Sequence, residues 1–212
     1  MRRWWRATGT SSSAAAETRE FGNRGRRLQM SEDPDSPDLE LAIVLRDGAW
    51  EDDCPGAVAL VDRAARATLA GVAEAARLPR PLELAIVLSG DAEVRALNRD
   101  YRDRDRATNV LSFPHEGGAL RAAAEGEPFL LGDVILARET LAREAAAAGI
   151  TLPAHLSHLV VHGVLHLLGY DHKDEAGAAR MEALEVALLT DLGIENPYRS
   201  ADEDRHALAG GL

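Results

Sequence analysis

The sequence predicts an α+β fold, in which a four-stranded mixed sheet has about five packed helices and a metal site lies on a central histidine-bearing helix. Three observations predict it. Apolar runs of strand length alternate with helical stripes along the chain. Two of these runs, at 39–45 and 82–88, share the sequence LELAIVL. The segment that follows Pro153 carries several histidines and is apolar on nearly every other side, as expected of a helix that is buried centrally.

Each element follows from local patterns. Four short apolar runs, most of them bounded by turn signals, predict strands at 39–45, 82–88, 109–113 and 130–136. Apolar stripes of helical period, with caps or stops at their ends, predict helices at 58–76, 91–97, 138–148, after Pro153 and from Asp174 to Leu192. Glycines end two of these helices: Gly149 follows the helix predicted at 138–148, and Gly169 follows the histidine-bearing helix.

The chain divides by composition into one domain and its extensions. Residues 1–29 hold seven arginines and two acids, a charge of +5 against −16 for the remainder, and the net charge is −11. We interpret residues 1–29 as a disordered basic arm or a mis-assigned start before Met30. Residues 30–38 are read as an acidic linker, 39–199 as a single catalytic metal-binding domain and 200–212 as a flexible tail.

Composition also bounds the class of protein. A chain of 212 residues, 46% hydrophobic and 28% charged, is ordinary for a globular protein and has no apolar run near the ~20 residues that span a bilayer. The single cysteine, Cys54, excludes an internal disulfide and suits a reducing cytoplasm, so we expect a cytoplasmic location. We interpret Cys54 as a small structural residue.

The histidines predict a metal site. On a helix, His162 and His166 are four residues apart and project from one face, and a turn after Gly169 can return His172 to the same point. Three nitrogen ligands with a fourth position open are typical of a catalytic zinc site, so we predict one Zn²⁺ ion on His162, His166 and His172. His158 is read as a neighbouring polar contact, because its eight-residue separation from His166 spans about 12 Å of helix.

Other interpretations of this segment stay open. Two histidines at this spacing also occur on helices that bind no metal. A zinc protease of the His-Glu-x-x-His type has its general base beside the first histidine, and here that position is Gly163. Asp171 is either a turn residue or an outer partner that orients a ligand imidazole.

Two blocks of sequence resemble a known family. The run 158–172, HLVVHGVLHLLGYDH, is similar to the signature of the YbeY family of bacterial endoribonucleases. A second block agrees in order and spacing, and consists of Leu97-Asn98, Tyr101-Arg102, Asp105 and the run 108–114, TNVLSFP. The resemblance extends from about residue 39 to residue 199.

The resemblance implies a single-strand-specific, metal-dependent endoribonuclease that acts in small-subunit rRNA maturation and in ribosome biogenesis and quality control. Its implied partners are RNA, especially small-subunit rRNA, and small ribosomal subunit proteins, with no membrane and no DNA. It also implies that Arg102 and the metal ligand His162 are the catalytic residues. Two alternatives remain: a zinc-dependent peptidase-like hydrolase, and a non-catalytic ribosome-assembly factor with a structural metal.

Five arginines lie within twelve residues before the third predicted strand, and they are Arg95, Arg99, Arg102, Arg104 and Arg106. Composition alone favours a solvated face paired with the aspartates at 100, 103 and 105, because a net negative chain has little general affinity for nucleic acid. The resemblance singles out Arg102 and assigns no role to the others. The pattern also leaves open whether water or the RNA 2′-hydroxyl attacks the phosphate.

Overall fold

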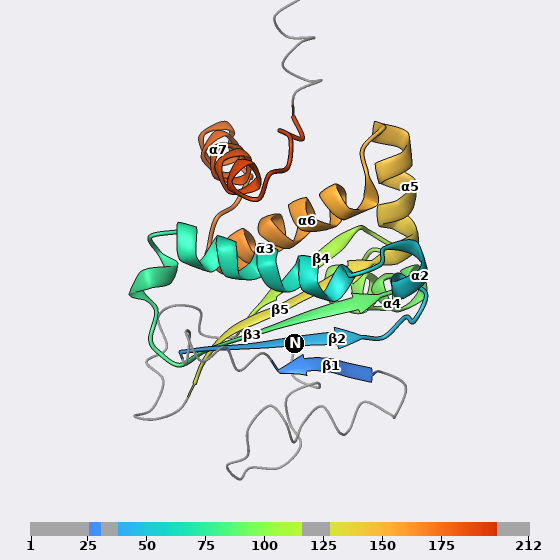
Figure 1. Ribbon diagram of the computed structural model, residues 1–212, viewed down its shortest axis with the longest axis horizontal. Helices are drawn as coiled ribbons and strands as arrows, with labels where there is room; N and C mark the ends of the chain where they lie inside the picture. Colours follow the sequence, from blue (N-terminus) through green and yellow to red (C-terminus); the bar gives the residue numbers. More distant parts are fainter. Residues whose placement is uncertain (1–25, 31–37, 116–127, 199–212) are drawn as a thin grey trace, which may run out of the picture.

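The computed structural model describes residues 26–30, 38–115 and 128–198 (Figure 1). Its strands are β1 (Arg26–Met30), β2 (Leu39–Leu45), β3 (Leu82–Ser89), β4 (Val110–Pro114) and β5 (Phe129–Ala137). Its helices are α2 (Trp50–Asp53), α3 (Ala57–Gly71), α4 (Asp91–Arg102), α5 (Arg138–Ala148), α6 (Leu152–Leu167) and α7 (Glu175–Asp191), with a 3₁₀ turn η1 (Ala75–Arg77).

The described strands form one mixed sheet in the order β1-β2-β3-β5-β4. The three central strands run parallel, and β4 pairs antiparallel with β5. These are the four strands that the sequence predicts, and the α+β class with its mixed sheet is confirmed. The two LELAIVL runs are neighbours, paired in register from Leu39 with Leu82 to Leu45 with Leu88.

A fifth strand, β1, extends the predicted sheet at one edge. It pairs antiparallel with β2, and residues 26–29 of it fall in the segment that composition assigns to the basic arm. Residues 1–25, most of the linker and the tail after residue 199 lie outside the described residues, so the division of the chain into arm, linker, domain and tail stays a prediction.

Helices cover both faces of the sheet. On one face, α3 and α6 pack over the strands and bury the larger core, as Figure 1 shows. On the other face lies α4, whose Val94 packs with Leu111 of β4 and Ile135 of β5. The side chains of β5 alternate between the two layers, since Val134 and Leu136 belong to the larger core.

The helix boundaries differ from the predicted ones in two places. Helix α3 ends at Gly71, because Val72 is extended and a separate 3₁₀ turn follows, whereas the stripe predicts one helix to residue 76. Helix α4 continues five residues beyond Leu97, to Arg102. Among the described helices, none is long and apolar enough by itself to cross a membrane, and α5 with α6 pass that test only as a pair bent by 115°.

Candidate metal centre

Helix α6 carries the histidines through the middle of the molecule. Its first turn is capped by Thr151, whose hydroxyl accepts a hydrogen bond from the backbone N–H of Ala154. The helix packs against α3, α5 and α7 and against strands β4 and β5, so most of its apolar side chains are fully buried. This central position leaves one stripe of histidines as its polar surface.

The end of α6 is fixed by Gly169. This glycine has φ of 95°, which only glycine adopts without strain, and its N–H donates to the carbonyl of His166. The next N–H, that of Tyr170, donates to the carbonyl of Leu165. Both bonds are those of a Schellman motif. The chain therefore reverses directly after the histidine stripe, as the sequence predicts.

His162 and His166 bring their Nε2 atoms to within 3.0 Å of each other. Each ring uses its other nitrogen elsewhere: His162 Nδ1 lies 2.8 Å from Oε1 of Glu185, and His166 Nδ1 lies 2.9 Å from the carbonyl oxygen of Tyr170. Because a carboxylate and a carbonyl only accept, both Nδ1 atoms carry the proton and donate. The two rings therefore point their Nε2 atoms at each other, an arrangement that is favourable when a cation, either a proton or a metal ion, lies between them.

His172 completes the group from the turn beyond Gly169. One nitrogen from each of His162, His166 and His172 lies within 4.8 Å of the other two. The ring centroid of His172 is 5.6 Å from that of His162 and 5.0 Å from that of His166. Three converging imidazoles with partly buried and exposed members fit a metal that prefers nitrogen ligands and keeps a position open.

A buried carboxylate supports this group from α7. The side chain of Glu185 is only 1% exposed. Besides the contact with His162, its Oε2 atom accepts from His158 Nε2 at 2.9 Å and from the hydroxyl of Tyr198. Burial raises the pKa of Glu185, but the hydrogen bonds from these three side chains outweigh it and lower that pKa to about 2. Glu185 is therefore ionised and fixes the orientation of His162.

The other imidazoles agree with this arrangement. Burial lowers the pKa of His166, and the neighbouring His162 and His172 lower it further, so the neutral form that binds metals is favoured. His158 contacts Glu185 instead of the three-histidine group, as its spacing predicts. His155 lies in the first turn of α6, 12% exposed, with Nε2 3.0 Å from Glu144.

The sequence leaves open whether Asp171 is a turn residue or an outer partner of a ligand imidazole. In the structure Asp171 accepts the backbone N–H of His172 at 2.8 Å and pairs with Lys173, so it shapes the turn. The partner of an imidazole is Glu185, 23 residues from His162 in sequence. Its signal was a glutamate on the apolar face of the last predicted helix, between Met181 and Leu188. The turn after α6 is also held by Tyr170, whose hydroxyl donates to Glu74 at 2.6 Å.

Arg102 lies at the end of α4, next to the strand that touches the histidine helix. Its guanidinium donates to the carbonyl of Ser112 in β4 at 3.1 Å. The hydroxyl of Ser112 donates in turn to the carbonyl of Gly163, which neighbours His162 on α6. A Cβ on Gly163 would lie 2.7 Å from Val134, so glycine there lets the helix and the sheet approach closely.

Comparisons with known proteins identify the family of the chain. The profile of the family described as Endoribonuclease YbeY matches residues 56–193. The Endoribonuclease YbeY of Rhodospirillum rubrum is 51% identical over 166 residues, covering 77% of this chain and 83% of that protein. The protein of the same name from Paramagnetospirillum magneticum is 52% identical over 161 residues, covering 76% of this chain and 96% of that one.

A solved structure is also similar, at a lower level. The solution structure of TM1509 from Thermotoga maritima has 19% identity and a TM-score of 0.41, and the match covers 73% of this chain and 91% of that one. The relatives from Rhodospirillum and Paramagnetospirillum, together with the family profile, are decisive. The chain belongs to the endoribonuclease YbeY family.

Proposed function

We propose that this protein is a zinc-dependent endoribonuclease that cleaves single-stranded RNA in the maturation of small-subunit rRNA. The observation that carries the proposal is the convergence of one nitrogen each from His162, His166 and His172 within 4.8 Å, with the Nδ1 atoms of His162 and His166 held by acceptors. The relatives of this chain bear the name endoribonuclease, which supplies the reaction class.

In this proposal His162, His166 and His172 hold one ion. When bound, zinc supplies a Lewis acid for a phosphoryl oxygen and lowers the pKa of a coordinated water. Glu185 and the carbonyl of Tyr170 accept the Nδ1 protons, and so would leave the Nε2 atoms of His162 and His166 available as ligands.

Arg102 is the second part of the proposed catalytic site. One of its terminal nitrogens is anchored on the carbonyl of Ser112, and no described carboxylate pairs with its guanidinium. Its remaining N–H groups are free to donate to phosphate oxygens, whose charge increases in the transition state. Arg102 therefore stabilises that charge without holding the metal.

Single-stranded RNA is the proposed substrate class because its phosphates are reached without opening a duplex. Small-subunit rRNA and proteins of the small ribosomal subunit are the proposed partners, in the cytoplasm. Two rivals predict other behaviour. A peptidase would hydrolyse peptides in place of RNA, and an assembly factor with a structural metal would lose its fold together with the ion.

A chelation experiment tests the proposal. The purified protein is incubated with a labelled single-stranded fragment of small-subunit rRNA and, separately, with a mixture of labelled peptides, before and after metal removal. Circular dichroism follows the fold. We expect RNA cleavage that chelation abolishes, that zinc restores and that is accompanied by a retained helical spectrum. Peptide hydrolysis without RNA cleavage, or unfolding on chelation, would contradict the proposal.

A further inference from the structure

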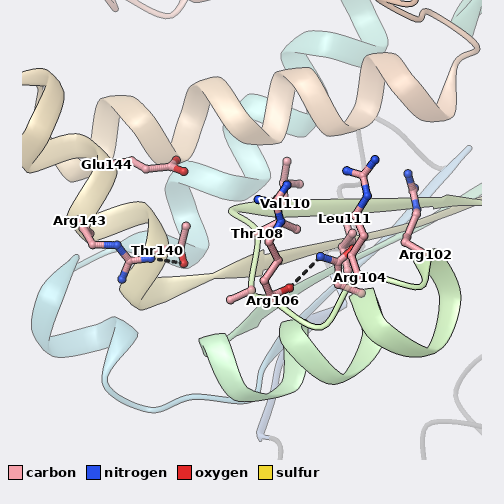
Figure 2. Close-up of a pocket in the computed structure, with 11 residues that line it drawn as sticks. Arg102, Arg104, Arg106, Thr108, Val110, Leu111, Thr140, Arg143 and Glu144 are labelled. Carbon is pink, nitrogen blue, oxygen red and sulfur yellow. Dashed lines mark hydrogen bonds between the residues drawn. The ribbon is translucent and has the colours of Figure 1, made fainter.

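A pocket of about 370 Å³ opens at the end of α4, on the side of the sheet edge formed by β4 (Figure 2). Arg102 is one of its lining residues, so the pocket begins at the proposed catalytic site. The loop after α4 contributes Arg104, Arg106 and Thr108, and α5 contributes Arg143 and Glu144. Four guanidinium groups thus face one carboxylate, in a chain whose net charge is −11.

At the end of α4 and in the loop that follows it, the arginines line the pocket and the aspartates lie outside it. The sequence from Arg102 to Arg106 alternates arginine and aspartate, yet the three arginines line the pocket and the two aspartates do not. Asp105 is turned away because Arg95 on α4 holds its carboxylate through two nitrogens, at 2.7 and 2.8 Å. Asp103 adopts φ of 56°, a left-handed conformation that aspartate tolerates, as it ends the helix.

A buried amide fixes the path of the loop. Asn98 is 4% exposed, and its side chain donates to the carbonyl of Arg106 at 2.7 Å. The backbone carbonyl of Asn98 accepts the backbone N–H of Arg104 at 3.2 Å. The backbone on each side of Asp105 is therefore tied to α4, and the alternation of side chains directs Arg104 and Arg106 into the pocket.

The arginines of the cluster fall into two groups. Arg95 and Arg99 are neutralised by Asp105 and Asp100. Arg104 and Arg106 are exposed, and neither forms an ion pair or a side-chain hydrogen bond with any residue of the described part. Figure 2 shows the side chains of Arg102 and Arg104 projecting in the same direction.

The carboxylate in the lining is already engaged. Oε2 of Glu144 accepts from the amide of Asn109 at 3.0 Å and lies 3.0 Å from His155 Nε2. Arg143 donates to the hydroxyl of Thr140 at 2.8 Å and forms an ion pair with Asp91 at 3.7 Å, so the unpaired guanidinium groups of the lining are those of Arg102, Arg104 and Arg106. The lining thus keeps an excess of unpaired guanidinium groups, whose planar fork matches a phosphate.

We propose that this pocket binds a backbone phosphate of the RNA strand next to the cleaved bond, with Arg104 and Arg106 as its ligands. The inference rests on the proposed function for the identity of the ligand. Phosphate contacts fix the register of a strand without reading its sequence. Arg104 and Arg106 are therefore binding residues, and Arg102, which also lines the pocket, acts on the neighbouring phosphate.

The test compares two double variants that each remove two positive charges. One is Arg104→Gln with Arg106→Gln. The control is Arg63→Gln with Arg99→Gln, which alters exposed arginines on α3 and α4 that do not line the pocket. Fluorescence anisotropy of a labelled 2′-O-methyl oligonucleotide gives the dissociation constant at several KCl concentrations. Single-turnover cleavage of the unmodified RNA at saturating protein gives the rate, and thermal unfolding checks the fold.

We expect the pocket variant to bind at least about tenfold more weakly at moderate salt, and the slope of log affinity against log salt to fall by about 0.7, because the pocket holds one phosphate and each phosphate contact on a single strand contributes about 0.7. Its saturating cleavage rate should stay within about threefold of the parent. The control should change affinity by less than about twofold.

Equal effects of the two double variants would overturn the pocket assignment, as would an unchanged slope with a collapsed saturating rate. If the parent binds the oligonucleotide but never cleaves the unmodified RNA, the proposed function fails, and the comparison of slopes still decides whether the pocket holds phosphate.

Discussion

Glu185 is the residue on which the geometry of the metal centre most depends after the histidines themselves. A carboxylate with 1% exposure is costly to bury unless hydrogen bonds offset its lost hydration. Here His158, His162 and Tyr198 supply them. The hydrogen bond from His162 also selects the tautomer of that ring. The interaction that stabilises the buried Glu185 therefore also favours the metal-binding form of the imidazole.

Replacing Glu185 with Gln should therefore weaken metal binding. The amide removes the negative charge and can present an N–H to His162, which favours the wrong tautomer. We expect zinc affinity to fall by 10- to 100-fold, as on loss of other outer partners of ligand histidines. Competition with a chromophoric chelator measures it. Glu182→Gln, an exposed glutamate on the same helix, is the control, and equal affinities for both variants would contradict the role of Glu185.

The sequence predicts the three clustered histidines but not their support. Spacing of four residues on a helix and a glycine stop are local signals, and they place His162, His166 and His172 together. Glu185 reaches His162 from another helix, and no local pattern contains that contact. Only the presence of a charged residue on an otherwise apolar helix face marked it.

Arg102 should act on the chemistry and not on the fold. Lysine keeps the charge but loses the planar fork, and alanine loses both. We expect Arg102→Lys and Arg102→Ala to retain metal and thermal stability while single-turnover RNA cleavage falls about a hundredfold or more. Arg99→Ala serves as the control. Cleavage by Arg102→Ala at the parental rate would show that this guanidinium takes no part in the reaction.

At the scale of elements, the turn that carries His172 is held against the first turn of α7. Asp174 caps this helix by accepting the N–H of Gly177 at 2.6 Å. A Cβ on Gly177 would lie 2.5 Å from the carbonyl oxygen of Asp171. The helix and the turn can approach this closely only because Gly177 has no side chain, and the position of His172 depends on that approach.

Gly177→Ala should therefore displace the turn and reduce metal affinity more than it reduces stability. The clash is with backbone, which cannot move aside as a flexible side chain does. We expect a loss of zinc affinity of roughly tenfold, as for a disturbed outer shell, and chelator competition measures it. Gly48→Ala is the control, because a Cβ there meets nothing within 4 Å. Unchanged zinc affinity in Gly177→Ala would show that the turn is not held in this way.

The elements differ in how well local sequence predicts them. The paired strands β2 and β3 and the helix α5 lie where apolar runs and end signals place them. Strand β1 was not predicted, because its residues are polar and arginine-rich and their pairing with β2 is a tertiary contact. Helix α4 exceeds its predicted end because the fold buries Asn98, whose side chain donates to the carbonyl of Arg106, and a polar sequence does not reveal that contact.

At the scale of the whole molecule, Arg138 joins elements that are distant in sequence. It follows β5 and pairs with Asp47 at 2.7 Å and with Asp53 of α2. Burial raises the pKa of Asp47, but hydrogen bonds from Arg138 and from the N–H of Ala49 outweigh it, so the pKa lies below its usual 3.8. A carboxyl with a depressed folded pKa stabilises the protein above its unfolded pKa, and this contribution is lost as pH falls through the folded value.

The parent should therefore lose stability below about pH 4 partly through Asp47. Asp47→Asn should lower the free energy of unfolding at pH 7 by about 1 kcal/mol, as for a partly exposed charged hydrogen bond. The difference between variant and parent should shrink at pH 3. Urea unfolding at both pH values measures it, and a difference independent of pH would remove the electrostatic explanation.

The central claim is that three imidazoles hold one ion that RNA cleavage requires. Zinc titration into metal-free protein, followed by the initial rate of cleavage of a single-stranded rRNA fragment, tests it most directly. We predict that the rate rises from background to a plateau at about one equivalent per chain, as for a single three-ligand catalytic site, and that His166→Ala shows no rise at that concentration. Full cleavage without metal, or a parental titration in His166→Ala, would contradict the claim.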